Sequence, residues 1–166
     1  FDDGLTGIFR AESKLTVLDA VISNVGSTEQ QAGDLKFRAT LPNGEILIDS
    51  PLILAEDIEL ESNGDLVVQG ESILGANGNV KLTALNEDDH DIVIGGQTEI
   101  FTSYEVVVRN SSSSGEVRLE GDVVISAETI NLCEVAGGVE SIKIEDTVKI
   151  FGTLLLPGDP GCSPLP

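Results

Sequence analysis

The chain of 166 residues is poor in aromatic residues, basic residues and histidine. It has five Phe, one Tyr, no Trp and no Met, and nine Lys or Arg stand against 29 Asp or Glu. The resulting formal charge of −20 leaves no basic cluster to neutralise phosphates, so we expect no nucleic-acid partner. Sugar rings are commonly held against aromatic faces, so the scarcity of aromatics argues against a carbohydrate-processing enzyme.

Long apolar runs and catalytic motifs are also missing. No stretch approaches the ~20 apolar residues of a membrane span, and no cleavable signal is present, so we expect no membrane insertion. The sequence has no nucleophile motif, phosphate-binding loop or zinc-ligand spacing. Paired carboxylates are frequent, but 29 acidic residues form such pairs by chance. We therefore expect a non-enzymatic protein without an organic cofactor.

What is present is a repeat of three short apolar strands, which runs from Leu15 to Leu156 with a period of roughly 20 to 27 residues. Alternate residues of a strand share one face, so each strand supplies a pair of inward side chains. The predicted pairs of the first strand are Ile46/Ile48, Leu66/Val68, Ile92/Ile94, Val117/Leu119 and Ile142/Ile144; those of the second are Leu52/Leu54, Ser72/Leu74, Thr98/Ile100, Val123/Ile125 and Val148/Ile150; those of the third are Ile58/Leu60, Val80/Leu82, Val106/Val108, Ile130/Leu132 and Leu154/Leu156.

The spacers between these strands follow two rules. The first inward residue of strand two always follows the last inward residue of strand one by four positions, which predicts a constant corner. The connection from strand three to the next strand one varies in length, so insertions should collect at one corner. A divergent copy begins at Leu15/Val17, continues with Val21/Ser23 and ends at Leu35 to Ala39.

These patterns predict an all-β fold, a right-handed parallel β-helix with three strands per turn and about six turns. A sandwich of short antiparallel strands is the alternative, but a sandwich has no reason to repeat one spacer order five times. The predicted organisation is an N-terminal cap or arm (1–14), the β-solenoid (15–156) and a tail rich in Pro and Gly (157–166).

Two cysteines and the first residue bear on location. A disulfide between Cys133 and Cys162 would close a loop of about 30 residues and contribute ~3 to 4 kcal/mol on the chain-entropy estimate. The alternative is two separate thiols. The chain begins with Phe1 and not with Met, which suggests a processed product or a fragment. We expect a secreted or cell-surface protein with the disulfide formed.

The loop around the single histidine is the one candidate for metal binding. His90 lies among Asp88, Asp89 and Asp91, whose oxygens suit Ca²⁺. The spacing does not match an EF-hand loop, and a solvated acidic loop is the alternative. Asn110 begins a formal glycosylation sequon in a serine-rich stretch, which we interpret as a flexible corner.

The stretch from Asp57 to Gly70, with Ile58, Leu60 and Leu66 spaced along it, resembles the repeats of bacterial filamentous-haemagglutinin-type exoproteins and related β-solenoid surface proteins. The resemblance lies in the pattern of the repeat and covers most of the chain. It implies a secreted or surface-attached rod used in adhesion, matrix building or filament assembly. It carries no active-site residues.

Three functions are open at this point. The first is a structural subunit of an extracellular or cell-surface filament or matrix, in which solenoid units stack end to end and the partner is a further copy of the chain. The second is an adhesin or calcium-dependent binding module with a glycan or protein ligand, and the third is a polysaccharide-active enzyme. The residues predicted to form the assembly interface are Phe1, Leu5, Ile8, Phe9, Val67, Val93, Pro164 and Leu165.

Overall fold

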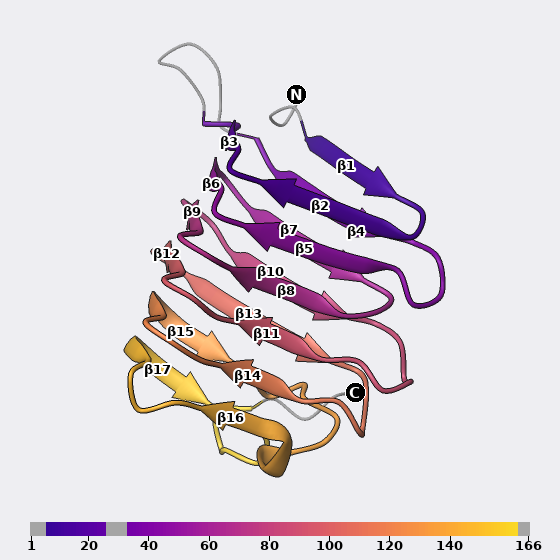
Figure 1. The fold of residues 1–166 in the computed structure, drawn as a ribbon. Helices are drawn as coiled ribbons and strands as arrows, with labels where there is room; N and C mark the ends of the chain where they lie inside the picture. Colours follow the sequence, from indigo (N-terminus) through magenta and orange to yellow (C-terminus); the bar gives the residue numbers. More distant parts are fainter. Residues whose placement is uncertain (1–5, 26–32, 163–166) are drawn as a thin grey trace, which may run out of the picture.

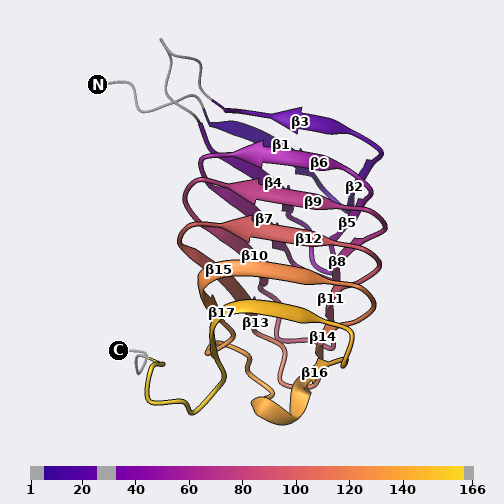
Figure 2. The same ribbon diagram turned by 90° about the vertical axis from the view of Figure 1, so that its left-hand side faces the viewer.

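The chain winds into a right-handed coil whose parallel strands stack on three sides, which we call sheets one, two and three (Figures 1 and 2). Sheets two and three are continuous with each other through β15 (Val124–Asn131), which belongs to both. The structure is a computed structural model and describes residues 6–25 and 33–162. Every strand pairs with the equivalent strand one turn above or below, as β8 does with β5 and β11. The predicted all-β parallel β-helix of about six turns is confirmed.

Each turn contributes one strand to each sheet in a fixed order. Sheet one contains β2 (Lys14–Leu18), β5 (Glu45–Asp49), β8 (Leu66–Gln69), β11 (Ile92–Ile94), β14 (Val117–Leu119) and β16 (Ile142–Ile144). Sheet two contains β3 (Val21–Ser23), β6 (Leu52–Ala55), β9 (Ile73–Ala76), β12 (Glu99–Thr102) and the first parts of β15 (Val124–Asn131) and β17 (Lys149–Leu155). Sheet three contains β1 (Gly7–Ala11), β4 (Leu35–Ala39), β7 (Ile58–Ser62), β10 (Val80–Ala84), β13 (Glu105–Asn110) and the second parts of β15 and β17. A 3₁₀ helix, η1 (Val139–Ser141), precedes β16.

The core is a column of aliphatic side chains inside the coil. In turns two to five, every predicted inward residue of sheets one and three is at most 1% exposed. Two of the predicted inward positions of sheet two are polar, and both hydroxyls are hydrogen-bonded within the fold. Ser72 Oγ donates to the carbonyl of Gln69, and Thr98 Oγ1 donates to the carbonyl of Gly95 at 2.6 Å. These bonds lie at the corner between sheets one and two and satisfy the two buried hydroxyls.

The predicted constant step between strands one and two is wrong for the first two turns. In β6 it is Ile53 that points inward, with no exposed surface, while Leu52 and Leu54 lie on the outer face. Ile53 is in register with Leu74, and the equivalent residue of β3 is Ile22. The pairs Leu52/Leu54 and Val21/Ser23 are thus corrected to the outer face of sheet two.

The reason is that the corner between sheets one and two is one residue shorter in these two turns. Asp19 and Ser50 adopt left-handed conformations there, with φ of 43° and 59°. In the second turn, for example, only two residues separate Ile48 from the next buried residue, Pro51. Turns three to five use three residues, with glycine in the left-handed position, as at Gly96 (φ 70°). Alternation could not reveal this difference, because Pro51 to Leu54 are all apolar.

The stack starts earlier than the predicted boundary at residue 15. Strand β1 pairs in register with β4, so Gly7–Ala11 extend sheet three above the first complete turn. The ring of Phe9 stacks on that of Phe37, with centroids 4.9 Å apart and planes 7° apart. Phe37 is fully buried as a result, while Phe9 remains 39% exposed at the end of the stack.

Candidate functional site

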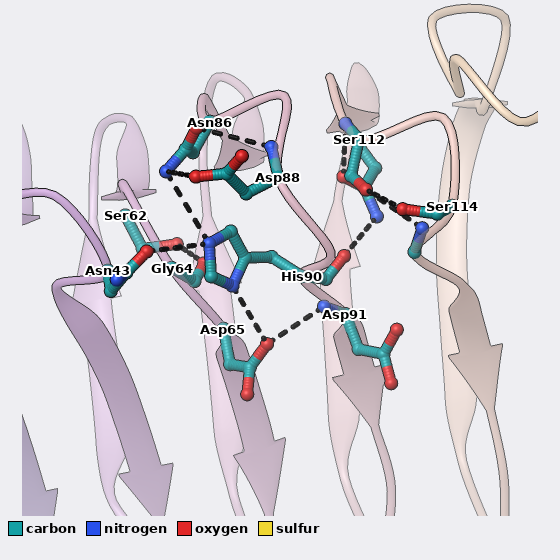
Figure 3. Close-up of polar contacts among 12 residues, drawn as sticks. Asn43, Ser62, Gly64, Asp65, Asn86, Asp88, His90, Asp91, Ser112 and Ser114 are labelled. Atoms are coloured by element: carbon teal, nitrogen blue, oxygen red, sulfur yellow. Dashed lines mark hydrogen bonds and ion pairs between the residues drawn. The ribbon is translucent and has the colours of Figure 1, made fainter.

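The corner from sheet three to sheet one carries a continuous polar network (Figure 3). Aspartates that precede the strands of sheet one accept backbone N–H groups from the next turn. Asp65 Oδ1 accepts from the amide of Asp91 at 2.9 Å, and Asp91 Oδ1 accepts from the amide of Glu116 at 2.8 Å. Charge-assisted bonds of this kind fix the height of one turn against the next. Asp65 and Asp91 therefore stabilise the stacking of neighbouring turns.

His90 connects three successive turns at this corner. Its Nδ1 lies 3.6 Å from Asp65 Oδ1, and its Nε2 lies 3.2 Å from Asn43 Oδ1. Asn86 lies beside the same ring, with Nδ2 3.5 Å from Nε2. The imidazole is largely enclosed, because its side chain is 13% exposed. Through these contacts the His90 side chain links neighbouring turns of the coil. Its polar contacts in the described residues are with Asn43, Asn86 and Asp65, and none is with a hydroxyl or thiol group.

The three aspartates predicted as calcium ligands do not converge. Asp91 Oδ2 is paired with Arg118 at 3.3 Å, and Asp88 accepts from the Asn86 side chain at 3.3 Å. Asp88, Asp89 and Asp91 all lie in the described part of the chain, which contains no group of three or more His, Cys, Asp or Glu arranged to hold a metal ion. Calcium binding at this loop stays an untested prediction.

The serine-rich stretch after β13 is held by a buried asparagine. Asn110 is fully buried, and its Nδ2 donates to the carbonyls of His90 at 3.0 Å and Glu116 at 3.4 Å. Its Oδ1 accepts from the amide of Ser112, which is itself fully buried. The interpretation of this stretch as a flexible corner is therefore wrong. The Asn110 amide of the sequon is not accessible for glycan attachment in the folded chain.

The outer face of sheet three carries a compact ion-pair group. Glu59 lies 3.3 Å from Lys36 Nζ and 3.2 Å from Arg38 Nη2. Partial burial acts to raise the pKa of Glu59, but the bonds and charges of Arg38 and Lys36 outweigh it and lower the pKa below its usual value. The group is a neutralised patch on an acidic molecule, and it offers no free acid for catalysis.

Cys133 and Cys162 are joined in a disulfide, with Cα atoms 5.5 Å apart. Cys133 follows β15 in turn five, and Cys162 lies in the tail after β17. The amide of Cys162 donates to the carbonyl of Asp159, whose side chain accepts from the amide of Leu156. The tail therefore folds on itself and is tied back one turn.

In the described part of the chain, the sixth turn leaves the interior of the stack partly exposed at the C-terminal end. Its inward residues continue the aliphatic column, but Ile144 is 37% exposed and Ile150 is only half-buried. Among the described strands, β16 pairs with β14 alone and β17 with β15 alone. One edge of each of these two strands is therefore unpaired among the described residues, at the end of the stack where β16 and β17 lie in Figure 1.

The residues predicted to form an assembly interface fall into three groups. Phe1, Leu5, Pro164 and Leu165 lie outside the described residues. Ile8 and Phe9 are exposed on β1 at the N-terminal end, at 56% and 39%. On sheet one, Val93 is 8% exposed and Val67 is half-buried, so this stripe offers little surface.

The outer face of sheet two carries exposed apolar residues that were not among the predicted interface residues. Val21, Phe101 and Phe151 point outward there and are 76%, 44% and 57% exposed. Phe101 lies over Gly75, where an added Cβ would come within 2.4 Å of its ring. Figure 2 shows this sheet facing the viewer. Phe101 and Phe151 occupy the same strand position two turns apart, with Ser126 between them, and the predicted inward pairs Thr98/Ile100 and Val148/Ile150 already imply that both rings point outward.

Searches of protein-family models, curated proteins and solved structures found no match to this chain. Within residues 6–25 and 33–162, no helix has the length and apolar character needed to cross a membrane. The exposed surfaces and the two ends of the solenoid are therefore the features from which a function can be inferred.

Proposed function

We propose that this protein is a non-enzymatic structural subunit of an extracellular or cell-surface filament or matrix, in which solenoid units stack end to end. The observation that carries the proposal is the open sixth turn, where the aliphatic column ends in half-buried and exposed side chains. Unpaired strand edges beside an apolar surface favour the addition of further strands. Another copy of the same repeat supplies both the edge and the matching column.

The N-terminal end has the complementary character. Phe9 is 39% exposed, and the inward residues Leu15 and Ile22 of the first turn are only partly buried. Head-to-tail contact of two copies would place these side chains against Ile144 and Ile150. Such heterologous contacts generate open filaments when they do not close into a ring. The resemblance of the repeat to β-solenoid surface proteins and the disulfide both suit an extracellular location.

The test is the assembly state of the purified protein and of two matched variants. Ile144→Lys places a charge on the inward face of the sixth turn, and Phe151→Lys places the same charge on its outer face. Both positions are already exposed, at 37% and 57%, so each substitution should cost less than ~1 kcal/mol of stability.

We expect wild type and Phe151→Lys to form elongated particles in negative-stain micrographs and in light scattering after gel filtration, and Ile144→Lys to remain monomeric. Dispersed monomers of the wild type at every salt and calcium concentration would overturn the proposal. Equal assembly by the two variants would also overturn it, because the end of the stack would then not be the contact.

A further inference from the structure

The disulfide encloses one structural unit of the fold. Cys133 follows the last strand of turn five and Cys162 follows the last strand of turn six, 29 positions later. Between them lie η1, β16 and β17, which together make up the whole sixth turn. The covalent ring therefore contains the whole sixth turn, together with the short segment around Val135 that remains bridged to Asn110 in the turn above.

The sixth turn is also less well buried than turns two to five. No residue from Ala136 to Cys162 is buried, although each complete turn before it contains several buried residues. Its strands hydrogen-bond on one side only. Local opening in proteins starts where few apolar contacts and many exposed backbone bonds coincide. The sixth turn meets both conditions.

This weakly held turn nevertheless covers the interior of turn five. Val117, Ile125 and Leu132 have no exposed surface, and the strands directly below them are β16 and β17. If the sixth turn left the stack, these residues would become the new end of the column. Retaining the sixth turn thus decides which apolar surface the C-terminal end presents.

We propose that the Cys133–Cys162 disulfide is a redox clasp that retains the sixth turn, and that its reduction releases this turn as one unit. While the bond is closed, a detached sixth turn would still be a ring of about 30 residues anchored to the stack, with much less conformational freedom than an open chain. On the chain-entropy estimate, opening the ring raises the detached population several hundred-fold, roughly.

The chemistry needs a dithiol reductant and a path to the bond. The reductant supplies two electrons and two protons, Cys133 Sγ and Cys162 Sγ each become a thiol, and the two sulfurs of the reductant join in a disulfide. Both cysteines are half-buried. Cys133 also lines a solvent-open cavity of about 290 Å³ together with Arg109, Asn110 and Glu134. A small dithiol can therefore approach Cys133.

Hydrogen exchange followed by mass spectrometry tests the clasp on the full chain. We expect dithiothreitol to speed amide exchange across β16 and β17 by two to three orders of magnitude, with the same factor in both strands. Exchange in β5 to β10 should stay unchanged. The variant Cys133→Ser/Cys162→Ser should exchange like the reduced wild type and should not respond to dithiothreitol.

Unchanged exchange in β16 and β17 on reduction would overturn the clasp, and so would a uniform increase along the whole chain. The exchange measurement does not require assembly, so it can succeed while the proposed stacking fails. Only the expected consequence for filaments, a change of the C-terminal contact surface on reduction, rests on the proposed function.

Discussion

At the scale of single residues, the buried polar groups of the variable corner hold the turns at fixed heights. Asn110 is the central case, because one fully buried side chain serves two carbonyls and one amide from different parts of the chain. Burial of an amide is favourable only when its donors and acceptor are satisfied. Asn110 therefore stabilises the fold through its complete set of bonds.

Replacing Asn110 by Ala should leave the carbonyl of His90 and the amide of Ser112 without their side-chain partner, while the carbonyl of Glu116 keeps its bond from the amide of Ile92. We expect the free energy of unfolding in urea to fall by about 2 to 4 kcal/mol, because an unsatisfied buried polar group costs ~1 to 3 kcal/mol. Asn63→Ala is the matched control, since Asn63 makes one exposed bond, to the carbonyl of Thr40 at 2.8 Å. Its cost should stay below ~1 kcal/mol, and equal costs for the two variants would contradict the structural role of Asn110.

At the scale of elements, glycines stack along the corner between sheets one and two. Gly70, Gly96 and Gly121 all have positive φ, and each lies against the equivalent residue of the turn above. A Cβ on Gly96 would meet the backbone N and O of Gly70 at 2.6 and 2.7 Å. The constant corner of the later turns thus depends on the absence of side chains at these three positions.

Gly96→Ala should therefore cost more than its backbone conformation alone. We expect a loss of about 2 to 4 kcal/mol, of which ~1 kcal/mol is the cost of positive φ for a residue with a Cβ. Gly158→Ala separates the two effects, because Gly158 has φ of 90° in the turn closed by the bond from the Asp159 amide to the Leu156 carbonyl, and no atom lies within 4 Å of its added Cβ. Thermal and urea unfolding of both variants should show Gly158→Ala losing only ~1 kcal/mol; a similar loss in both would contradict the close stacking.

At the scale of the whole molecule, charge repulsion opposes both folding and association. The net charge is −20, and the described ion pairs, such as Arg109 with Glu134, neutralise only a few acidic groups. Salt screens like charges, with a Debye length of about 10 Å at 0.1 M and about 3 Å at 1 M. Stacking of two copies brings together two molecules that each carry this net charge, so assembly should depend on salt more strongly than folding does.

Stability should accordingly rise with ionic strength. We expect the free energy of unfolding to increase by on the order of 1 kcal/mol between 20 mM and 0.5 M NaCl, because screening weakens the repulsion among acidic residues. Replacing NaCl by choline chloride provides the control, since it screens equally and lacks a small cation. A fall in stability with salt would show that the ion pairs outweigh the repulsion.

The sequence by itself determined the coil. Its alternating Val, Ile and Leu pairs predicted the column, the three sheets and the number of turns, because a repeat that buries one face in each strand has few ways to pack. It also indicated the disulfide partners, since only two cysteines exist. These features follow from local alternation and from composition, which are readable without coordinates.

Only the tertiary structure decided the register of the first two turns, the surroundings of Asn110 and the state of the two ends. Ile53 faces inward because Ser50 turns the chain in a left-handed conformation, and a run of apolar residues does not display that choice. Asn110 is buried because backbone groups from Asn86–Asp91 and from Glu116 converge on it. The sixth turn has the same apolar pattern as the others, yet its strands pair on one side only among the described residues, and exposure of this kind arises from stacking and not from local sequence.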